Sequence, residues 1–277
     1  MPELPEVQTV VNELKNDLIA DRIVHIKPIW QKVLYNFKPN DIIIDGKENL
    51  IQDVTRRAKF IIIHFHSHIL AVHLRMTGKL FFSVSNLIPK HTTAVLDLES
   101  GKKLIFQDTR KFGRIYLYPD LEPIHIRHGP EPLGENFSPK WLHKALNERK
   151  RNIKSLLLDQ SFIAGLGNIY VDESLWATGI HPSSISNAIP EGISRRLHGN
   201  IQKILSAAIA AKGTTIINFS FLNGQSGRYA SQLRIFGRYG QPCINCGRDI
   251  EKIKVAGRGT YICGRCQKTY TRSRNIS

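Results

Sequence analysis

The four cysteines constrain this chain most, because all of them lie near its end in two Cys-x-x-Cys pairs, Cys243/Cys246 and Cys263/Cys266. Two such pairs, separated by residues 247–262, are typical of a zinc site in which four thiolates form a tetrahedron. The alternative is two disulfides, but the amino terminus lacks the basic-then-apolar pattern of an export signal. We therefore predict one structural zinc ion, which supplies folding energy to a segment too short to build its own core.

The apolar residues of the first part of the chain change their spacing after one helix. Over residues 3–20 they recur with helical spacing, which predicts an amphipathic helix. Short β-rich runs then follow one another, bounded by turn residues such as Asp45-Gly46 and Ser100-Gly101. These runs are 42–44, 60–65, 69–72, 80–82, 94–96, 103–106 and 115–118. No long helical pattern interrupts them, so we expect an antiparallel β-sandwich or barrel.

The segment from Pro119 to Pro139 is rich in proline and glycine, and it marks the expected domain boundary. Beyond it the apolar pattern is helical, with helices expected over 138–146, 153–158, 167–177 and 194–212. Residues 213–228 are polar and aperiodic, and a loop of that length is usually functional or mobile. The expected fold class is α+β: an N-terminal helix plus antiparallel β-sandwich, then a helical domain with a four-cysteine zinc finger. The expected domains are 1–130, 131–235 and 236–277.

The charge balance points to a polyanionic partner. The 277 residues include 39 Lys and Arg against 23 Asp and Glu, a net charge of +16. In a chain of this size such an excess favours nucleic acid. A membrane surface is the weaker alternative, because the sequence has no long amphipathic basic helix and no apolar run of transmembrane length.

The first residues carry a possible nucleophile. If Met1 is removed, Pro2 has a free secondary amine, and the carboxylate of Glu3 follows it directly. An α-amino group titrates near ~8, so it is partly neutral and nucleophilic at neutral pH. A structural alternative is that Pro2 and Glu3 only start a helix, where proline and acidic residues are both favoured.

Six motifs occur in order along the whole chain. They are Pro2-Glu3-Leu4-Pro5-Glu6-Val7, Arg57-Ala58-Lys59, His73-Leu74-Arg75-Met76-Thr77-Gly78, Asp108-Thr109-Arg110-Lys111-Phe112-Gly113, Gly165-Leu166-Gly167-Asn168-Ile169-Tyr170 and the four cysteines. With them the chain resembles the bacterial formamidopyrimidine-DNA glycosylases, repair enzymes that remove oxidised purines such as 8-oxoguanine. The resemblance implies a β-sandwich with the amino-terminal helix, then a helix–two-turns–helix domain with a zinc finger, and DNA in the cleft between them.

The resemblance implies four catalytic residues. Pro2 would attack the sugar C1′ and displace the damaged base, forming a protonated Schiff base. Glu3 would act as acid and base beside it. Lys59 would donate a proton in the first elimination, and Arg258, in the zinc finger, would assist the second.

The resemblance also implies the contacts with DNA. His73 and Asn168 match residues that hold phosphates, and three others match positions that contact DNA: His91, Arg110 and Arg149. Met76, Arg110 and Phe112 match a trio that fills the void left by a flipped nucleotide, with the guanidinium of Arg110 bonded to the orphaned cytosine.

The expected partner is damaged double-stranded DNA, bound by a monomer without membrane attachment, in the bacterial cytoplasm at the nucleoid. Two alternatives stay open. One is the same fold acting on oxidised pyrimidines, as in enzymes of the endonuclease VIII type. The other is a damaged-DNA or zinc-ribbon binding protein without catalysis, against which the presence of Pro2, Glu3 and Lys59 argues.

Overall fold

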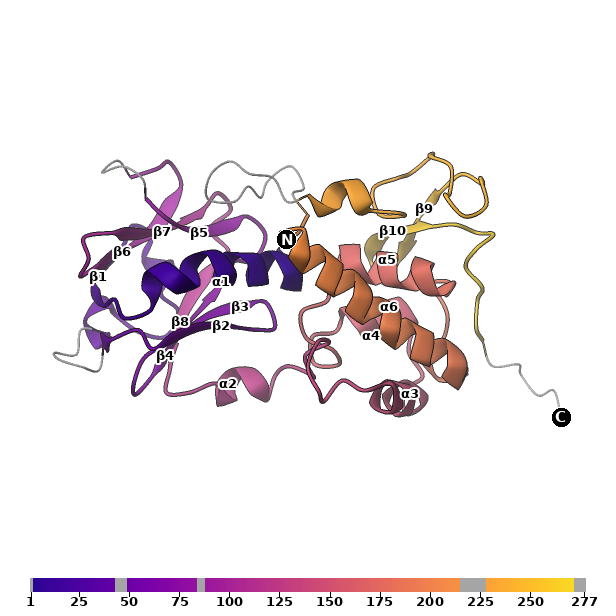
Figure 1. Ribbon diagram of the computed structural model, residues 1–277, viewed down its shortest axis with the longest axis horizontal. Helices are drawn as coiled ribbons and strands as arrows, with labels where there is room; N and C mark the ends of the chain where they lie inside the picture. Colours follow the sequence, from indigo (N-terminus) through magenta and orange to yellow (C-terminus); the bar gives the residue numbers. More distant parts are fainter. Residues whose placement is uncertain (1, 43–48, 84–87, 215–227, 272–277) are drawn as a thin grey trace. The chain divides into compact units, whose positions relative to one another are not determined.

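The computed structural model describes residues 2–42, 49–83, 88–214 and 228–271. Its contacts divide the chain into two compact units, coloured along the sequence in Figure 1. The first unit is Met1–Ile126 with Ala211–Ala230, and the second is Arg127–Ala210 with Ser231–Ser277. The division into domains at 130 and 235 stays a prediction. Within the described residues, no helix combines the length and apolar character needed to cross a membrane.

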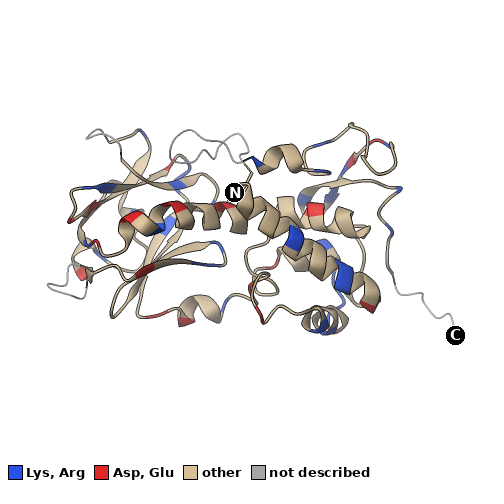
Figure 2. Ribbon diagram, in the orientation of Figure 1, with Lys and Arg blue, Asp and Glu red and all other residues tan. Residues whose placement is uncertain are grey.

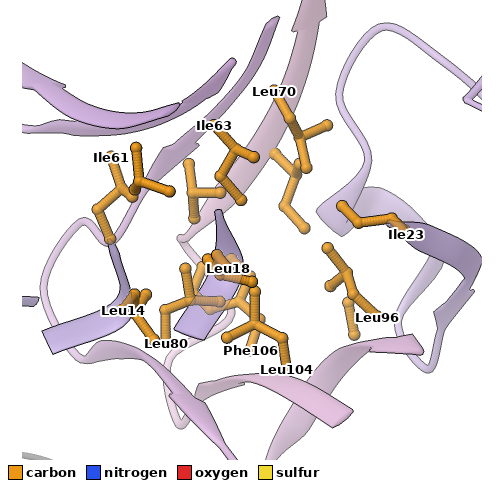
Figure 3. Close-up of a cluster of buried hydrophobic side chains, with 14 of the residues drawn as sticks. Leu14, Leu18, Ile23, Ile61, Ile63, Leu70, Leu80, Leu96, Leu104 and Phe106 are labelled. Carbon is orange, nitrogen blue, oxygen red and sulfur yellow. The ribbon is translucent and has the colours of Figure 1, made fainter. Parts of the chain in front are cut away.

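Helix α1 (Leu4–Leu18) is the amphipathic helix that the sequence predicts. Pro5 lies in its first turn, where a backbone N–H has no intrahelical partner and none is lost. The buried face of α1 joins the main apolar core of the first unit. Leu14 and Leu18 lie there against side chains of the sheets, as Figure 3 shows.

Two four-stranded antiparallel sheets share this core. One has the order β1-β6-β7-β5, and the other β2-β3-β4-β8. The strands of the first sheet are β1 (Ile23–Pro28), β5 (Gly78–Phe82), β6 (Thr92–Leu98) and β7 (Lys103–Asp108). Those of the second are β2 (Asp53–Arg57), β3 (Phe60–His64), β4 (Ile69–His73) and β8 (Arg114–Tyr118). Because side chains of both sheets and of α1 enter one cluster, the arrangement is the predicted sandwich.

Sequence patterns located most of these strands. The predicted runs from 60 to 118 fall on β3 to β8. Strands β1 and β2 were not predicted, because polar residues interrupt their few apolar ones. The predicted run at 42–44 is not a described strand: Ile42 follows the 3-10 helix η2 (Pro39–Asp41), and the other two residues lie outside the described part.

The second unit is mainly helical. Its helices are α3 (Pro139–Asn147), α4 (Ile153–Leu158), α5 (Asn168–Thr178), α6 (Glu191–Ala210) and the 3-10 helix η4 (Ser186–Ala188). The Ser138 hydroxyl caps α3 by accepting from the Trp141 N–H at 3.1 Å, and Asn152 caps α4 in the same way. Gly179, with φ of 79°, ends α5 in the left-handed conformation that glycine favours.

The zinc-finger part of the second unit contains a β-hairpin. Its strands are β9 (Glu251–Val255) and β10 (Arg258–Ile262), which pair antiparallel with Arg258 opposite Val255. Ala256 and Gly257 form the two-residue turn, and both have positive φ, as a type I′ turn requires. Arg258 is therefore the first residue after a tight turn.

The remaining helices of the described residues are short. The first unit also contains η1 (Gln31–Val33) and α2 (Glu122–His125), and η5 (Tyr229–Gln232) follows the predicted loop of residues 213–228. Most of that loop, 215–227, lies outside the described residues. Its two ends pair with each other, since Thr214 and Arg228 form an antiparallel bridge.

Candidate functional site

The proposed nucleophile and its carboxylate lie at the start of α1. Pro2 is buried, and Glu3, 3% exposed, takes the extended conformation that precedes the helix. The backbone N–H of Glu3 donates to Glu6 Oε2 at 2.9 Å. The local geometry therefore fixes the backbone of Glu3 at the positive end of the helix dipole, where a carboxylate is favourable.

Glu6 ties this helix start to the beginning of the predicted loop. Its Oε1 accepts from the backbone N–H of Thr214 at 2.8 Å and from the Thr214 hydroxyl at 3.0 Å. Gly213 has φ of +75°, and a Cβ there would lie 2.9 Å from Glu6 Oε1. Glycine is therefore required for this close approach. This role of Glu6 was not predicted, although an acid on the apolar face of a helix is a visible signal in the sequence.

Lys59 is carried by the turn between β2 and β3. Ala58 in this turn has φ of 52°, and its carbonyl accepts from Arg56 Nη1 at 2.9 Å. Arg56 Nε also donates to Gln8 Oε1 of α1 at 3.0 Å, so the turn packs beside the helix. Lys59 is 6% exposed, which is unusual for a lysine and means that its side chain is enclosed by protein.

His73 ends β4 on the same sheet, in register with Phe60 of β3. Its Nδ1 accepts the N–H of Arg75 at 3.0 Å, and its ring lies edge-on to the Phe60 ring with centroids 4.6 Å apart. These contacts hold the imidazole in one orientation. His73 therefore also packs at the end of the sheet, against Phe60, which directly follows Lys59 in the sequence.

The three predicted void-filling residues lie on two turns of the first unit. Met76 is in the β4–β5 turn and is 38% exposed, while Phe112, in the β7–β8 turn, is 49% exposed. Arg110 is also exposed, and its guanidinium lies 4.7 Å from the Phe112 ring centroid. His91, likewise exposed, precedes β6. All four of these side chains are therefore accessible at the surface of the first unit.

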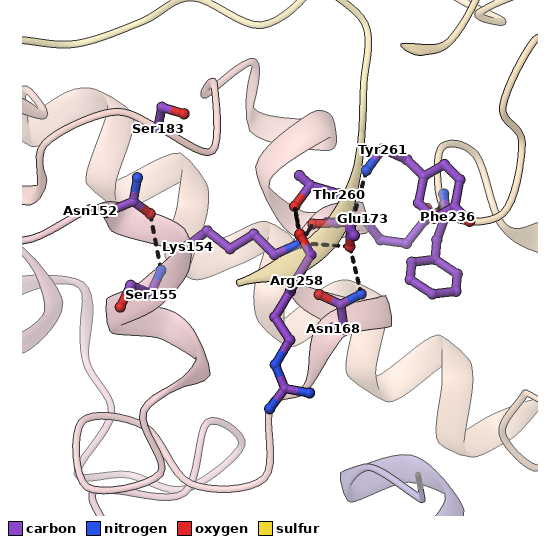
Figure 4. A network of polar contacts seen from close by, with 12 residues as sticks. Asn152, Lys154, Ser155, Asn168, Glu173, Ser183, Phe236, Arg258, Thr260 and Tyr261 are labelled. Carbon is purple, nitrogen blue, oxygen red and sulfur yellow. Dashed lines mark hydrogen bonds and ion pairs between the residues drawn. The ribbon is translucent and has the colours of Figure 1, made fainter. Parts of the chain in front are cut away.

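In the second unit the structure brings Asn168 and Arg258 together (Figure 4). Asn168 is the first residue of α5, and its Nδ2 donates to the carbonyl of Gly259 at 3.0 Å, next to Arg258. Among the described residues, the buried Oδ1 of Asn168 has no hydrogen-bond partner. Arg258 is exposed. A helix N-terminus beside a guanidinium is suited to binding an anion such as a phosphate.

A buried ion pair connects the helix and the strand that carry Asn168 and Arg258. Lys154 Nζ donates to Asp172 Oδ1 at 2.6 Å and to Thr260 Oγ1 at 2.8 Å, and both charged side chains are 0% exposed. Asp172 Oδ2 accepts the backbone N–H of Tyr261 at 3.1 Å. Burial raises the pKa of Asp172 to about 6, although Lys154 and the Tyr261 N–H act in the opposite direction. The pair thus joins helices α4 and α5 to strand β10.

Glu173, the next residue of α5, fixes the segment that leads to the zinc finger. Its carboxylate accepts the backbone N–H groups of Arg234, Ile235 and Phe236 at 2.9–3.1 Å. Burial raises the pKa of Glu173, while these N–H groups and Arg234 lower it. The partners of Asp172 and Glu173 were not predicted, because the only signal in the sequence was two adjacent acids within an apolar helix.

Arg149 lies just after α3. Its Nη1 donates to the carbonyl of Ala145 at 3.0 Å, and its guanidinium lies 5.2 Å from the Phe162 ring centroid. Among the described contacts, Arg149 is not part of the network around Asn168. Its predicted contact with DNA stays a prediction.

The four cysteines gather into one cluster with the geometry of a zinc site. Their sulfurs all lie within 4.8 Å of one another, with Sγ–Sγ distances of 3.8 Å for Cys243–Cys266 and 3.4 Å for Cys246–Cys263. Zinc–sulfur bonds of about 2.3 Å in a tetrahedron place sulfurs about 3.8 Å apart. A disulfide would need about 2.05 Å, so that alternative is wrong. The donor set fits one structural zinc ion and leaves no open coordination position.

Trp176 of α5 packs against this cluster. Its indole N–H is buried and has no oxygen or nitrogen partner in the described part of the chain. Burial opposes ionisation of Cys243, but the backbone N–H of Asn245, the nearby Trp176 indole and the neighbouring thiols lower the pKa of Cys243 to about 7. Gln267 adds a second link, because it accepts from the Cys263 N–H and donates to the carbonyl of Ile180.

Family models match all three parts of the chain. The formamidopyrimidine-DNA glycosylase N-terminal domain matches residues 1–115, and the H2TH domain of the same family matches residues 128–220. The zinc finger found in FPG and IleRS matches residues 240–269, which contain the four cysteines.

Full-length relatives and solved structures agree with these matches. Formamidopyrimidine-DNA glycosylases of Desulforamulus reducens and Protochlamydia amoebophila are 40% and 42% identical, over 97% of this chain and 99% and 100% of theirs. A Lactococcus lactis FPG mutant bound to Fapy-dG DNA has a TM-score of 0.87, and MutM bound to carbocyclic 8-oxo-G DNA has 0.86. Both are 35% identical and cover 97% of this chain and 100% of their own. The chain therefore belongs to the family of formamidopyrimidine-DNA glycosylases.

Proposed function

We propose that this chain is a bifunctional DNA glycosylase and AP lyase that removes oxidised purines, 8-oxoguanine and formamidopyrimidines, from double-stranded DNA. The observation that carries the proposal is the start of α1, where Pro2 and Glu3 are buried together at a helix N-terminus. Family membership supports it, as do the Fapy-dG and 8-oxo-G in the DNA bound to the similar FPG and MutM.

The chemistry begins at the nitrogen of Pro2, once Met1 is removed. Its lone pair attacks C1′, the bond to the damaged base breaks, and the base leaves with that electron pair and a proton. Glu3 acts as the acid and base in these steps, because its carboxyl group can accept the proton that the Pro2 nitrogen loses and can donate a proton in turn. The C1′–O4′ bond of the sugar then breaks, its electron pair stays on O4′, which takes up a proton, and the nitrogen lone pair forms the double bond of an iminium ion. This ion is an electron sink that acidifies the 2′ hydrogen, so that loss of this hydrogen as a proton expels the 3′ phosphate. Lys59 donates a proton in this first elimination, and Arg258 assists the second, which expels the 5′ phosphate.

The DNA contacts divide into two kinds. Asn168, His73 and Arg258 hold phosphates, which position the duplex without reading its sequence. Met76, Arg110 and Phe112 enter the stack where the damaged nucleotide has left it. The exposure of these three side chains and the pairing of Asn168 with the Arg258 hairpin support this division. His91 and Arg149 add contacts to the DNA, and Lys and Arg residues occur in both units (Figure 2).

The role of zinc in the proposed function is structural. When bound, it supplies four metal–sulfur bonds that order the segment around the hairpin β9–β10. Trp176, Gln267 and the Lys154–Asp172 pair then connect that hairpin to the helices. The protein acts as a monomer on damaged DNA in the bacterial cytoplasm, at the nucleoid.

Excision from a panel of duplexes tests the proposal. Each duplex contains 8-oxoguanine, a formamidopyrimidine or an oxidised pyrimidine such as thymine glycol, and single-turnover rates of base release are measured. We expect both purines to be released faster than the pyrimidine. A preference for the pyrimidine would instead support an enzyme of the endonuclease VIII type. Binding to damaged DNA without any covalent adduct after borohydride reduction would support a non-catalytic binder.

A further inference from the structure

Asp108 is a buried carboxylate to which the proposed chemistry assigns no role. It ends β7 and is 1% exposed. Its Oδ2 accepts the backbone N–H groups of Phe112 at 2.8 Å and Gly113 at 2.7 Å. Its Oδ1 accepts the backbone N–H of Arg110 at 3.1 Å and the hydroxyl of Thr77. Four donors therefore converge on one carboxylate, and hydrogen bonds to an ionised acceptor are stronger than those between neutral groups.

These bonds join the two turns that carry the void-filling residues. Arg110 and Phe112 belong to the β7–β8 turn, and Thr77 follows Met76 in the β4–β5 turn. The Thr77 hydroxyl also accepts from the backbone N–H of Arg110 at 3.2 Å, which closes a small network.

The same residue reaches a third predicted DNA contact. The backbone N–H of Asp108 donates to the carbonyl of His91 at 2.9 Å. His91, Arg110 and Phe112 are all exposed, so Asp108 is the buried centre of an otherwise exposed group.

The surroundings leave this carboxylate little freedom. A Cβ at Gly113 would lie 2.4 Å from Phe106 Cζ and 3.2 Å from Asp108 Oδ2, so glycine is needed for the turn to close over Asp108. At the other turn, a Cβ at Gly78 would lie 2.4 Å from the carbonyl oxygen of Leu74. Both turns therefore have tightly defined backbones at the points where Asp108 joins them.

We propose that Asp108 is a positioning residue that holds Arg110, Phe112 and Met76 as one preformed group and thereby sets discrimination by the base opposite the lesion. The inference rests on the proposed function, because it acts through the contact of Arg110 with the orphaned base. A preformed group loses less conformational entropy on binding, and a guanidinium discriminates between bases only if it is held in one geometry.

The test is the ratio of single-turnover excision rates for 8-oxoguanine opposite cytosine and opposite adenine. A ratio does not change with the fraction of active protein, so a merely structural defect leaves it unaltered. A good base contact discriminates by roughly tenfold to a hundredfold. We expect Asp108→Ala to lose most of the discrimination supplied by Arg110. Asp108→Asn should lose less of this discrimination, because its amide oxygen can still accept the hydrogen bonds that one of the two carboxylate oxygens accepts in the parent.

Two comparisons show whether Asp108 acts through Arg110. The double variant Asp108→Ala/Arg110→Ala should have the same ratio as Arg110→Ala alone, since the positioned group is then absent. Asp97→Ala, on the neighbouring strand β6, removes a partly exposed carboxylate and should keep the ratio of the parent. An unchanged ratio in Asp108→Ala, or effects that simply add in the double variant, would overturn the inference.

A milder pair of variants covers the case in which Asp108→Ala does not fold. Thr77→Val removes one hydroxyl and should lower the ratio, whereas Thr77→Ser keeps the hydroxyl and should not. Hydrogen exchange in the free protein gives a readout that needs no activity: the amides of Phe112 and Gly113 should exchange faster in Asp108→Asn than in the parent. Unaltered exchange would overturn the inference while leaving the proposed function intact. A parent that releases no oxidised purine would overturn both.

Discussion

Replacing Lys154 by methionine removes the cation of the buried pair while keeping an unbranched side chain of similar length. In the parent, Lys154 Nζ contacts Asp172 Oδ1 at 2.6 Å and Thr260 Oγ1 at 2.8 Å, with both charged side chains 0% exposed. The variant leaves Asp172 with one backbone donor, the N–H of Tyr261. Breaking a buried pair in this way costs about 3–5 kcal/mol. That is roughly a hundredfold to several-thousandfold in the opening equilibrium of the second unit.

The cost should depend on pH in a defined direction. The pKa of Asp172 already lies at about 6, above its ordinary value of 3.8, because of burial. Without Lys154 it rises further, since the Lys154 charge and hydrogen bond lower it in the parent. The penalty is therefore absent below the unfolded-state pKa, where the carboxyl group is protonated in both states. It grows as pH rises through the raised folded-state pKa, so the variant should lose less stability at pH 5 than at pH 8.

Zinc release in increasing urea measures this loss of stability in the second unit, which contains the Lys154–Asp172 pair. The zinc ligands belong to the second unit, so the midpoint of release reports its opening and not that of the β-sandwich. Lys150→Met is the matched control, because Lys150 is exposed four residues earlier. Adding Asp172→Asn to the variant should restore part of the stability by removing the unpaired charge. A loss below about 1 kcal/mol, typical of a surface pair, would show that the Lys154–Asp172 pair does not stabilise the second unit as a buried pair, as would an equal loss at both pH values.

Three further predictions concern the chemistry, the metal and the phosphate contact. Glu3→Gln should lower the rate of base excision by about 10²–10⁴ while the Kd for DNA changes by less than about tenfold, which excision kinetics and filter binding can measure. Zinc chelation or Cys263→Ser should abolish DNA binding while proteolysis still yields a resistant β-rich fragment, and unchanged affinity would contradict a DNA-contacting finger. Asn168→Ala should weaken binding to all damaged duplexes alike, so a change confined to one opposite base would contradict a phosphate contact.

The sequence predicted those parts of the fold that depend on local spacing. Helical periodicity located α1 because one face of this helix is buried in the core, and β-rich runs located β3 to β8 for the same reason. Strand β2, with the sequence Asp-Val-Thr-Arg-Arg, has one apolar residue and gave no pattern. The zinc site was predictable because its ligands form two short-range pairs whose spacing is itself the signal.

The polar contacts around the candidate site were not predictable in this way. Lys154 and Asp172 lie on different helices, and Glu6 contacts Thr214, which is far from it in the sequence. Such partners are set by tertiary packing, and periodicity reports only which face of an element is buried. The possible nucleophile at Pro2 was inferred from its free amine beside Glu3, whereas the predicted role of Lys59 came only from the resemblance to a family.

The proposed chemistry depends on a covalent intermediate at Pro2, which trapping with borohydride detects. The protein is reacted with a duplex that contains 8-oxoguanine, reduced, digested and mapped by mass spectrometry. We expect a deoxyribose-derived adduct on the nitrogen of Pro2, in protein whose intact mass lacks Met1. We expect no adduct and no excision for protein that keeps Met1, because an amide nitrogen is not nucleophilic. An adduct on Lys59, or full base excision by the form that retains Met1, would rule out Pro2 as the nucleophile.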